Sequence, residues 1–207
     1  MPKLGIAIVG SGMIGAVHRR AALLAGAEVR GVAASTPQRA QEVAQAWNVP
    51  RAYRDIEDVV ADPQVQVVHV CTPNHLHRPM AQAALAAGKH VICEKPLATT
   101  LGDAQDLAAL AASSGLVATV PFVYRYHPVV REARARIAAG DIGPLHLIHG
   151  RYPQDWVLDP ASNNRRVDPV LGGTSRVVAD IGSHWCDLVE WVSGARFTGV
   201  RAAFATV

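Results

Sequence analysis

Three glycines at the spacing G-x-G-x-x-G follow a short apolar run near the start of the sequence. The run Leu4 to Val9 is typical of a β-strand, and a helical pattern begins directly after the loop. In this context the first glycine permits a tight turn, the second lets the backbone approach a pyrophosphate, and the third lets helix and strand pack closely. The N–H groups and the positive dipole end of the helix attract phosphates. An ordinary βα turn is the alternative, but the context predicts a dinucleotide site at Gly10, Gly12, Met13, Ile14 and Gly15.

Short apolar runs alternate with helical patterns as far as residue 121. Strands are expected at 6–9, 28–34, 51–53, 65–70, 90–93 and 116–121. Helices are expected at 13–25, 37–47, 55–62, 79–87 and 101–114. Thr36 and Thr100 are typical helix-capping residues at the starts of two of these helices. The alternation predicts a doubly wound, parallel α/β sheet of the Rossmann type.

The pattern changes after residue 122. A helix is expected at 129–139, a strand at 145–150, a long irregular stretch at 151–176, a helix at 180–192 and a strand at 197–207. We therefore expect a dinucleotide-binding domain at 1–122 and an α+β open-sheet domain for substrate and oligomer contacts at 123–207. Because two helices and two strands make a thin domain, we expect the sequence to be a truncated piece of a longer protein. An oligomer edge at the last strand is the alternative.

Composition excludes several classes of protein. Half of the 207 residues are hydrophobic and 18% are charged, which is typical of a chain with a packed core. The net charge is +3 and the basic residues are scattered, so nucleic acid is not an expected partner. Three cysteines without C-x-x-C spacing indicate reduced thiols and no structural zinc. We find no signal peptide and no apolar run of about 18 residues, and therefore expect a cytoplasmic protein without membrane contact.

Polar residues follow the expected strands, where ligands bind in doubly wound folds. The first group is Thr72-Pro73-Asn74 with two nearby histidines, and the second is Glu94-Lys95-Pro96. Asp180 and His184 form a third group, four residues apart and thus on one face of an α-helix. Each group also has a simpler interpretation, as polar loop residues, a solvated lysine or a local salt bridge. No spacing typical of a metal site is present.

Four segments of the sequence carry a family resemblance. They are GSGMIGAVHRRA from Gly10, CTPNHLHRPMAQAALAAGKHVICEKPLA from Cys71, FVYRYHPVVREARARIAAGDIGPLHLIHGRY from Phe122, and GGTSRVVADIGSHWCDLVEWVSG from Gly172. The glycine spacing alone is common, but it is specific when E-K-P and D-x-G-x-H-x-x-D follow in this order. The chain resembles the glucose–fructose oxidoreductase / inositol dehydrogenase / MocA (Gfo/Idh/MocA) family of nicotinamide-dependent oxidoreductases.

The resemblance implies roles for particular residues. Lys95 matches the lysine that contacts the substrate hydroxyl and the cofactor ribose, His184 the acid/base, and Asp180 the carboxylate that orients it. The resemblance also implies homodimers or homotetramers. Residues expected beside the cofactor are Cys71, Thr72, Pro73, Asn74, His77, Glu94 and Lys95. Residues expected beside the substrate are Tyr126, Arg166 and Asp168, with Trp156 as an aromatic platform for a sugar face.

Two departures from the family pattern affect specificity. Dehydrogenases that select NAD commonly carry an acidic residue after the second strand, where this chain has Ser35 and Thr36, with Arg39 nearby. Hydroxyls and an arginine suit a 2′-phosphate, so NADP is slightly favoured over NAD. Many relatives also carry tryptophan where this chain has Arg165, which alters the substrate loop.

These features favour an NAD(P)-dependent dehydrogenase that acts on a secondary alcohol of a sugar, polyol or cyclitol, or on its ketone. One alternative is a glycoside-cleaving enzyme that uses bound NAD for transient oxidation. The other is a non-enzymatic, nucleotide-sensing relative. Net reduction of free cofactor separates the first hypothesis from the second.

Overall fold

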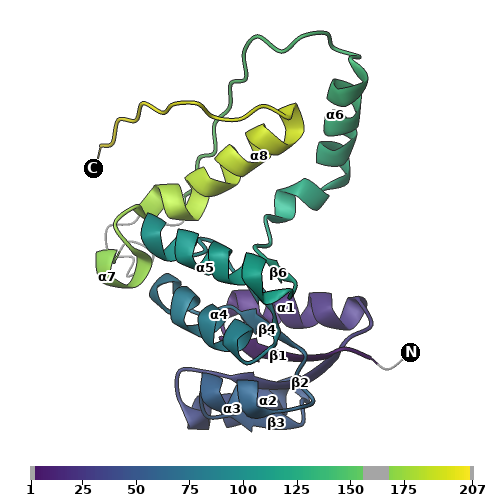
Figure 1. Ribbon diagram of the computed structural model, residues 1–207, viewed down its shortest axis with the longest axis vertical. Helices are drawn as coiled ribbons and strands as arrows, with labels where there is room; N and C mark the ends of the chain where they lie inside the picture. Colours follow the sequence, from purple (N-terminus) through teal and green to yellow (C-terminus); the bar gives the residue numbers. More distant parts are fainter. Residues whose placement is uncertain (1–2, 156–167, 206–207) are drawn as a thin grey trace. The chain divides into compact units, whose positions relative to one another are not determined.

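The computed structural model describes residues 3–155 and 168–205. Its strands and helices alternate through the first half of the chain (Figure 1). The strands are β1 (Gly5–Val9), β2 (Glu28–Ala33), β3 (Arg51–Tyr53), β4 (Val67–Val70), β5 (His90–Cys93) and β6 (Ala118–Thr119). The α-helices are α1 (Met13–Leu24), α2 (Pro37–Trp47), α3 (Ile56–Ala61), α4 (His77–Ala86), α5 (Leu101–Ser114), α6 (Pro128–Ala139), α7 (Pro169–Gly172) and α8 (Ser183–Ser193). Shorter turns are the 3₁₀ segments η1 (Asn74–Leu76) and η2 (Val123–Tyr126) and the π-helical segment η4 (Val178–Gly182).

The six strands form one parallel sheet in the order β3-β2-β1-β4-β5-β6. This is the strand order of a Rossmann fold, so the prediction of a doubly wound sheet is confirmed. The order reverses between β1 and β4, which pair from Ile6 with Val67 to Val9 with Val70. A crevice for a ligand is expected outside the carboxyl ends of these two strands.

Helices cover both faces of the sheet. On one face, Ala7 and Val68 pack with residues of α3, α4 and α5. On the other face, Ile8 packs with residues of α1 and with Trp47 at the end of α2. Because both faces are buried, the central strands are almost continuously apolar, as a parallel sheet requires.

Side-chain caps explain where two of these helices begin. Thr36 Oγ1 accepts the Arg39 backbone N–H at 3.1 Å and starts α2, with proline as its first residue. Thr100 Oγ1 accepts the backbone N–H of Asp103 at 3.1 Å and starts α5. Both caps agree with the sequence prediction.

Some predicted boundaries and strands were wrong. Helix α4 begins at His77, two residues earlier than expected, and β6 contains only two residues. No strand forms at 145–150, nor at 197–205 within the range that the structure describes. An alternating sequence becomes a strand only when a neighbour supplies hydrogen bonds, and the described residues contain no such neighbour for either segment.

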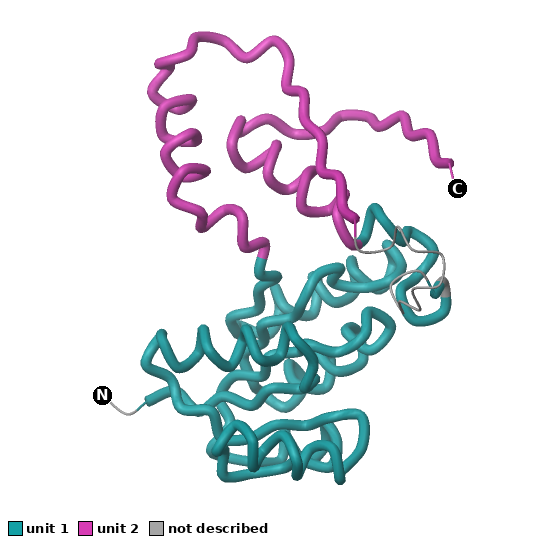
Figure 2. Tube along the Cα trace, turned by 180° about the vertical axis from the view of Figure 1, so that it is seen from behind, with its two compact units in different colours: residues 1–121, 163–179 teal, residues 122–162, 180–207 magenta. Residues whose placement is uncertain are grey.

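Close contacts divide the chain into two compact units (Figure 2). The first unit contains residues 1–121 and 163–179, and the second contains residues 122–162 and 180–207. The segment that carries α7 thus groups with the sheet, although it lies far along the sequence. The domain boundary at residue 122 stays a prediction.

Candidate active site

The glycine loop has a backbone that only residues without a side chain can adopt. Gly10 has a φ of +110°, and a Cβ atom there would overlap the carbonyl of Cys71. A Cβ atom at Gly15 would overlap the carbonyl oxygen of Gly10, so α1 lies directly against the loop. The Gly10 N–H donates to the Ala33 carbonyl at 2.9 Å, which fixes the loop beside the end of β2. The loop therefore brings bare backbone to the point where the strand order reverses.

The start of α1 fits the phosphates of a dinucleotide. Gly12 is the N-cap residue, and neither a capping side chain nor an acidic residue occupies the first turn. The first N–H groups of a helix have no partner within the helix, so they remain to bind an anion. Nearby in the fold, Thr72 follows β4, and its buried Oγ1 has no hydrogen-bond partner among the described residues. The loop backbone and this hydroxyl suit a bound dinucleotide.

His77 joins the two loops that follow β4 and β5. Its Nδ1 lies 2.6 Å from the Pro96 carbonyl oxygen and its Nε2 lies 2.9 Å from the Thr72 carbonyl oxygen. Only 1% of this residue is exposed, and burial lowers its pKa even though both carbonyls favour the charged form. The ring nitrogens of this predicted cofactor residue are therefore used to hold two loops together.

Asn74 and His75, in η1, contact α7. The Asn74 side-chain amide donates to the Gly172 carbonyl at 2.9 Å, and His75 Nδ1 lies 3.3 Å from the Leu171 carbonyl oxygen. Asp168, a predicted substrate residue, caps α7, where its Oδ1 accepts the Val170 backbone N–H at 2.7 Å. These contacts stabilise the loop after β4 from a segment about a hundred residues away in the sequence.

Glu94 and Lys95 follow β5, at the same edge of the sheet. The carboxylate of Glu94 accepts the Lys95 backbone N–H at 3.2 Å and lies 3.0 Å from His18 Nε2 on α1. Burial acts to raise the pKa of Glu94, but the hydrogen bonds from His18 and Lys95 hold it below its ordinary value. Lys95 is half-buried, and its peptide bond to Pro96 is cis.

The residues predicted to contact the ribose of the cofactor, and so to select between NAD and NADP, follow β2. Ser35 and Arg39 are exposed, and the Thr36 hydroxyl is used as the cap of α2. The Arg39 guanidinium forms an exposed ion pair with Glu42, with Nη1 and Oε2 2.9 Å apart. Such exposed pairs contribute little free energy, so the guanidinium can exchange this partner for a ligand.

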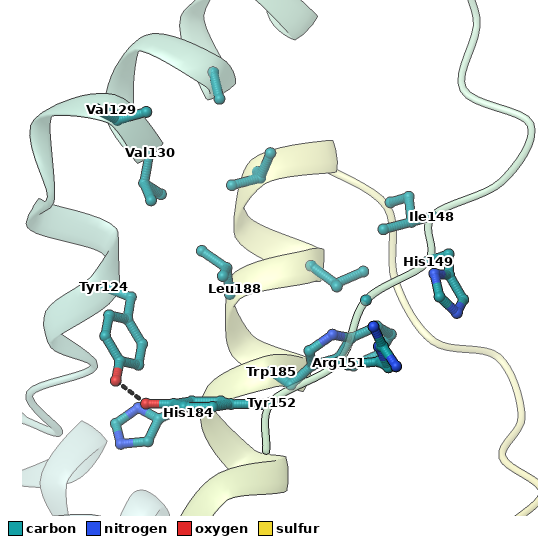
Figure 3. Close-up of a pocket in the computed structure, with 14 residues that line it drawn as sticks. Tyr124, Val129, Val130, Ile148, His149, Arg151, Tyr152, His184, Trp185 and Leu188 are labelled. Carbon is teal, nitrogen blue, oxygen red and sulfur yellow. Dashed lines mark hydrogen bonds between the residues drawn. The ribbon is translucent and has the colours of Figure 1, made fainter. Parts of the chain in front are cut away.

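His184 lies in the second unit, among aromatic side chains. Its ring centroid is 4.9 Å from that of Tyr124 and 5.9 Å from that of Phe122. The hydroxyl of Tyr124 is hydrogen-bonded to that of Tyr152 beside His184 (Figure 3). This bond, burial, and the negative charges of Tyr124 and Asp180 raise the pKa of Tyr152 to about 12.

The backbone around Asp180 differs from the sequence prediction. Asp180 lies in the π-helical segment η4, whereas His184 is the second residue of α8. The four-residue spacing therefore does not place both side chains on one face of a regular α-helix, because a π turn contains more residues. Segments of this kind occur frequently at functional sites.

Sequence reasoning missed Tyr124 and Tyr152 and selected Tyr126, which is 71% exposed in η2. The alternation of Tyr124, Arg125 and Tyr126 gave no signal, because a 3₁₀ turn decides which ring faces inward. Arg125 instead forms an ion pair with Asp187, which is buried on α8. The predicted substrate residues Trp156 and Arg166 lie outside the described residues.

A pocket of about 600 Å³ lies within the second unit, and His184 is one of the residues that line it (Figure 3). Aliphatic residues of α6 and α8, such as Val130, Leu188 and Val192, contribute much of its lining. A polyhydroxylated molecule would leave its hydroxyls unpaired against these side chains. We therefore do not place a polar substrate against the aliphatic part of this pocket.

No group of three or more His, Cys, Asp and Glu residues in the described ranges is arranged to hold a metal ion. None of the helices described combines the length and the hydrophobicity needed to cross a bilayer.

The strand order and the glycine loop define a dinucleotide-binding α/β protein of the Rossmann type. The model of an oxidoreductase family with an NAD-binding Rossmann fold matches residues 4–122, and the model of the GFO/IDH/MocA C-terminal domain matches residues 130–207. The chain therefore belongs to the Gfo/Idh/MocA oxidoreductase family, and the resemblance noted in the sequence is confirmed.

Several characterised relatives match most of the chain. The levoglucosan dehydrogenase of Pseudarthrobacter phenanthrenivorans is 34% identical over 216 residues, covering 100% of this chain and 55% of that protein. A structure of levoglucosan dehydrogenase with NADH and levoglucosan has a TM-score of 0.84 at 33% identity, covering 93% of this chain and 55% of that one. An inositol dehydrogenase homologue complexed with NAD⁺, from Azotobacter vinelandii, has a TM-score of 0.84 at 34% identity, covering 92% and 53%. The chain spans about half the length of these relatives.

Proposed function

We propose that the protein is an NAD(P)-dependent oxidoreductase acting on a secondary alcohol of a sugar, polyol or cyclitol, or on the corresponding ketone. The observation that carries this proposal is the bare glycine loop from Gly10 to Gly15, at the switch point of a Gfo/Idh/MocA sheet. The named relatives support the substrate class, because one is a levoglucosan dehydrogenase and the inositol dehydrogenase homologue has also been solved with NADH and myo-inositol.

Three residues are proposed to carry the chemistry. His184 accepts the proton of the substrate hydroxyl, since histidine has the side-chain pKa closest to neutrality. Asp180 orients the imidazole, and the Lys95 ammonium stabilises the negative charge that develops on the substrate oxygen. The nicotinamide, when bound, supplies the hydride acceptor. The edge contacts of Phe122 and Tyr124 support this role, because they restrict the orientation of the His184 ring.

The remaining predicted residues are proposed as binding contacts. The cofactor contacts are Gly12, Met13, Ile14, Ser35, Thr36, Arg39, Cys71, Thr72, Pro73, Asn74, His77 and Glu94. The substrate contacts are Tyr126, Trp156, Arg166 and Asp168. Of these, Thr72 has independent support, because its buried hydroxyl has no hydrogen-bond partner among the residues that the structure describes.

Lys95→Ala tests the catalytic assignment. We expect turnover with a preferred sugar or polyol to fall by about a hundredfold or more, because a group that stabilises transition-state charge is lost. The measurement is cofactor reduction at 340 nm across a panel of sugars, polyols and cyclitols, with NAD⁺ and with NADP⁺. Lys3→Ala changes an exposed lysine and serves as the control. Turnover of Lys95→Ala within a few-fold of the wild type would contradict the assignment.

Arg39→Ala tests the cofactor preference. We propose that the site accepts NADP at least as well as NAD, because no acidic residue follows β2 and the Arg39–Glu42 pair is exposed. Affinity for NADPH is expected to fall about fivefold to tenfold, with affinity for NADH unchanged, in fluorescence titrations. Arg54→Ala removes a similar exposed ion pair, with Asp58, and is the matched control. Equal losses for both cofactors would overturn the preference.

A further inference from the structure

Three titratable side chains, from α1, from β4 and from the residue after β5, form a hydrogen-bonded triad inside the first unit. His18 lies on the inner face of α1, His69 is in β4, and Glu94 directly follows β5. His18 Nε2 is 3.0 Å from Glu94 Oε1, and His18 Nδ1 is 3.0 Å from His69 Nδ1. The two histidines are 8% and 5% exposed, and their rings meet edge to face at 5.1 Å. The imidazole of His18 therefore bridges Glu94 and His69.

The geometry constrains where the protons lie. An ionised carboxylate only accepts hydrogen bonds, so His18 Nε2 carries a proton and donates it to Glu94. The contact between the two Nδ1 atoms needs one proton in total. If His69 Nδ1 donates that proton, only an acceptor, His69 Nε2, is left unpaired, and an unpaired acceptor is tolerated better than an unpaired donor. We assign this arrangement, with burial lowering the pKa of His69 to about 4 and so keeping the ring neutral.

The triad of His18, His69 and Glu94 cannot conduct protons beyond His69. His69 Nε2 is buried and has no hydrogen-bond partner in the part of the chain that the structure describes. The neighbours of His69 in the sheet are Ile8 and Ile92, which are both apolar. A proton relay needs a hydrogen-bond donor or acceptor at each end. The role of the triad is therefore to hold its side chains in place.

We propose that His18 is a positioning residue that holds Glu94 in the orientation needed to support the Glu94–Lys95 turn. One carboxylate oxygen of Glu94 accepts from His18, and the other accepts the Lys95 backbone N–H at 3.2 Å. His18 lies one turn beyond Gly15 on the same buried face of α1, so the bond ties the dinucleotide-binding helix to the residue before Lys95. This inference rests on the proposed role of Lys95 in cofactor and substrate binding.

Loss of His18 has a definite consequence for the charge of Glu94. The groups that interact with this carboxylate are His18 from α1, Cys71 after β4, His77 from α4, and Cys93 and Lys95 on its own segment. Without the His18 donor, only the contacts with Lys95 oppose the effect of burial, so the pKa of Glu94 rises. The protonated carboxyl then rotates to donate, and the Lys95 turn loses its support.

The test is a double-mutant cycle on NADH affinity between pH 5.5 and 8. We expect His18→Leu to weaken NADH binding about tenfold, with the loss growing as the pH falls, since one unit of pKa is a factor of ten. His18→Gln retains an N–H near the position of Nε2 and is expected to stay within about threefold of the wild type. In the Glu94→Gln background, His18→Leu is expected to have little further effect, because the group through which it acts is already absent.

Two outcomes of the cycle would overturn the proposal. An equal loss on His18→Leu in both backgrounds would mean that His18 acts by packing alone. A loss with His18→Gln as large as with His18→Leu would mean that the donated hydrogen bond is irrelevant. Leu107→Ala, on the buried face of α5, controls for instability. It is expected to lower the unfolding temperature without creating a pH dependence of NADH affinity.

A second measurement separates this inference from the proposed function. ¹⁵N NMR of the imidazole nitrogens at pH 7 is expected to find a proton on His18 Nε2 and on His69 Nδ1, and a shifted His18 signal in Glu94→Gln. A deprotonated His18 Nε2 would overturn the inference, whether or not NADH binds. Failure of the wild type to bind NADH or NADPH, with the expected NMR result, would contradict the proposed function alone.

Discussion

At the residue scale, Gly15 has no room for a methyl group. Its backbone faces the Gly10 carbonyl, which is itself held by the left-handed conformation of Gly10. Gly102, also in a helix, has open space around the position of a Cβ atom. The two glycines look alike in the sequence but have opposite packing environments.

We expect Gly15→Ala to lower the free energy of unfolding by about 1–3 kcal/mol, because α1 must move away from the loop. It is also expected to weaken NADH binding at least tenfold. Gly102→Ala, the matched control, is expected to stabilise the protein by about 0.5–1 kcal/mol through lower backbone entropy in the unfolded chain. Urea unfolding and fluorescence titration measure both effects. A stabilising Gly15→Ala would contradict the close approach described for the loop.

At the element scale, ion pairs between segments differ in importance from those within one helix. The Arg125–Asp187 pair joins η2 to α8, and the Asp187 side chain is only 8% exposed. The Glu132–Arg136 pair lies within α6, and both side chains are more than half exposed. Solvent screens the second pair far more strongly than the first.

We expect Asp187→Ala to lower the free energy of unfolding by about 1–2 kcal/mol, because Arg125 loses two charge-assisted hydrogen bonds. Arg125 is partly exposed, so water replaces some of this loss. Glu132→Ala is the control and is expected to cost less than about 0.5 kcal/mol. Urea unfolding followed by the fluorescence of Trp185 and Trp191 on α8 makes the comparison. Equal losses of unfolding free energy in Asp187→Ala and Glu132→Ala would contradict this prediction.

At the scale of the whole molecule, buried histidines make stability depend on pH. Burial and the nearby His18 lower the pKa of His69 from 6.5 to about 4 in the folded protein. Between these values the unfolded chain binds a proton at His69 that the folded chain does not. Stability from this residue is therefore present above pH 6.5 and is lost as the pH falls toward 4. His77, whose pKa is also lowered, acts in the same direction.

His69→Gln is expected to remove the part of this pH dependence that His69 causes. The wild type should lose up to about 3 kcal/mol more than the variant between pH 7.5 and pH 4.5, at 1.36 kcal/mol per pKa unit. Urea unfolding at several pH values measures the difference. Parallel pH profiles for the wild type and His69→Gln would contradict this prediction, because they would mean that His69 has the same pKa in the folded and unfolded protein.

Local sequence patterns determined the first half of the molecule. Strand and helix periods, threonine caps and glycine spacing act over a few residues, and they predicted the Rossmann sheet, the loop from Gly10 to Gly15 and the loop positions of Thr72 and Lys95. The proposed catalytic roles of Lys95, Asp180 and His184 came from the family resemblance, and they stay predictions.

Tertiary structure decided which of these residues meet. His18 reaches Glu94 across 76 positions, and Tyr124 lies beside His184 across 60, and no local pattern encodes such pairs. The strands expected at 145–150 and 197–207 have the right alternation, but a strand also needs a hydrogen-bonding neighbour. The π turn at Asp180 likewise replaced the regular helix that the spacing predicted. Sequence determined the local conformations, while burial and long-range hydrogen bonds decided which side chains share a site.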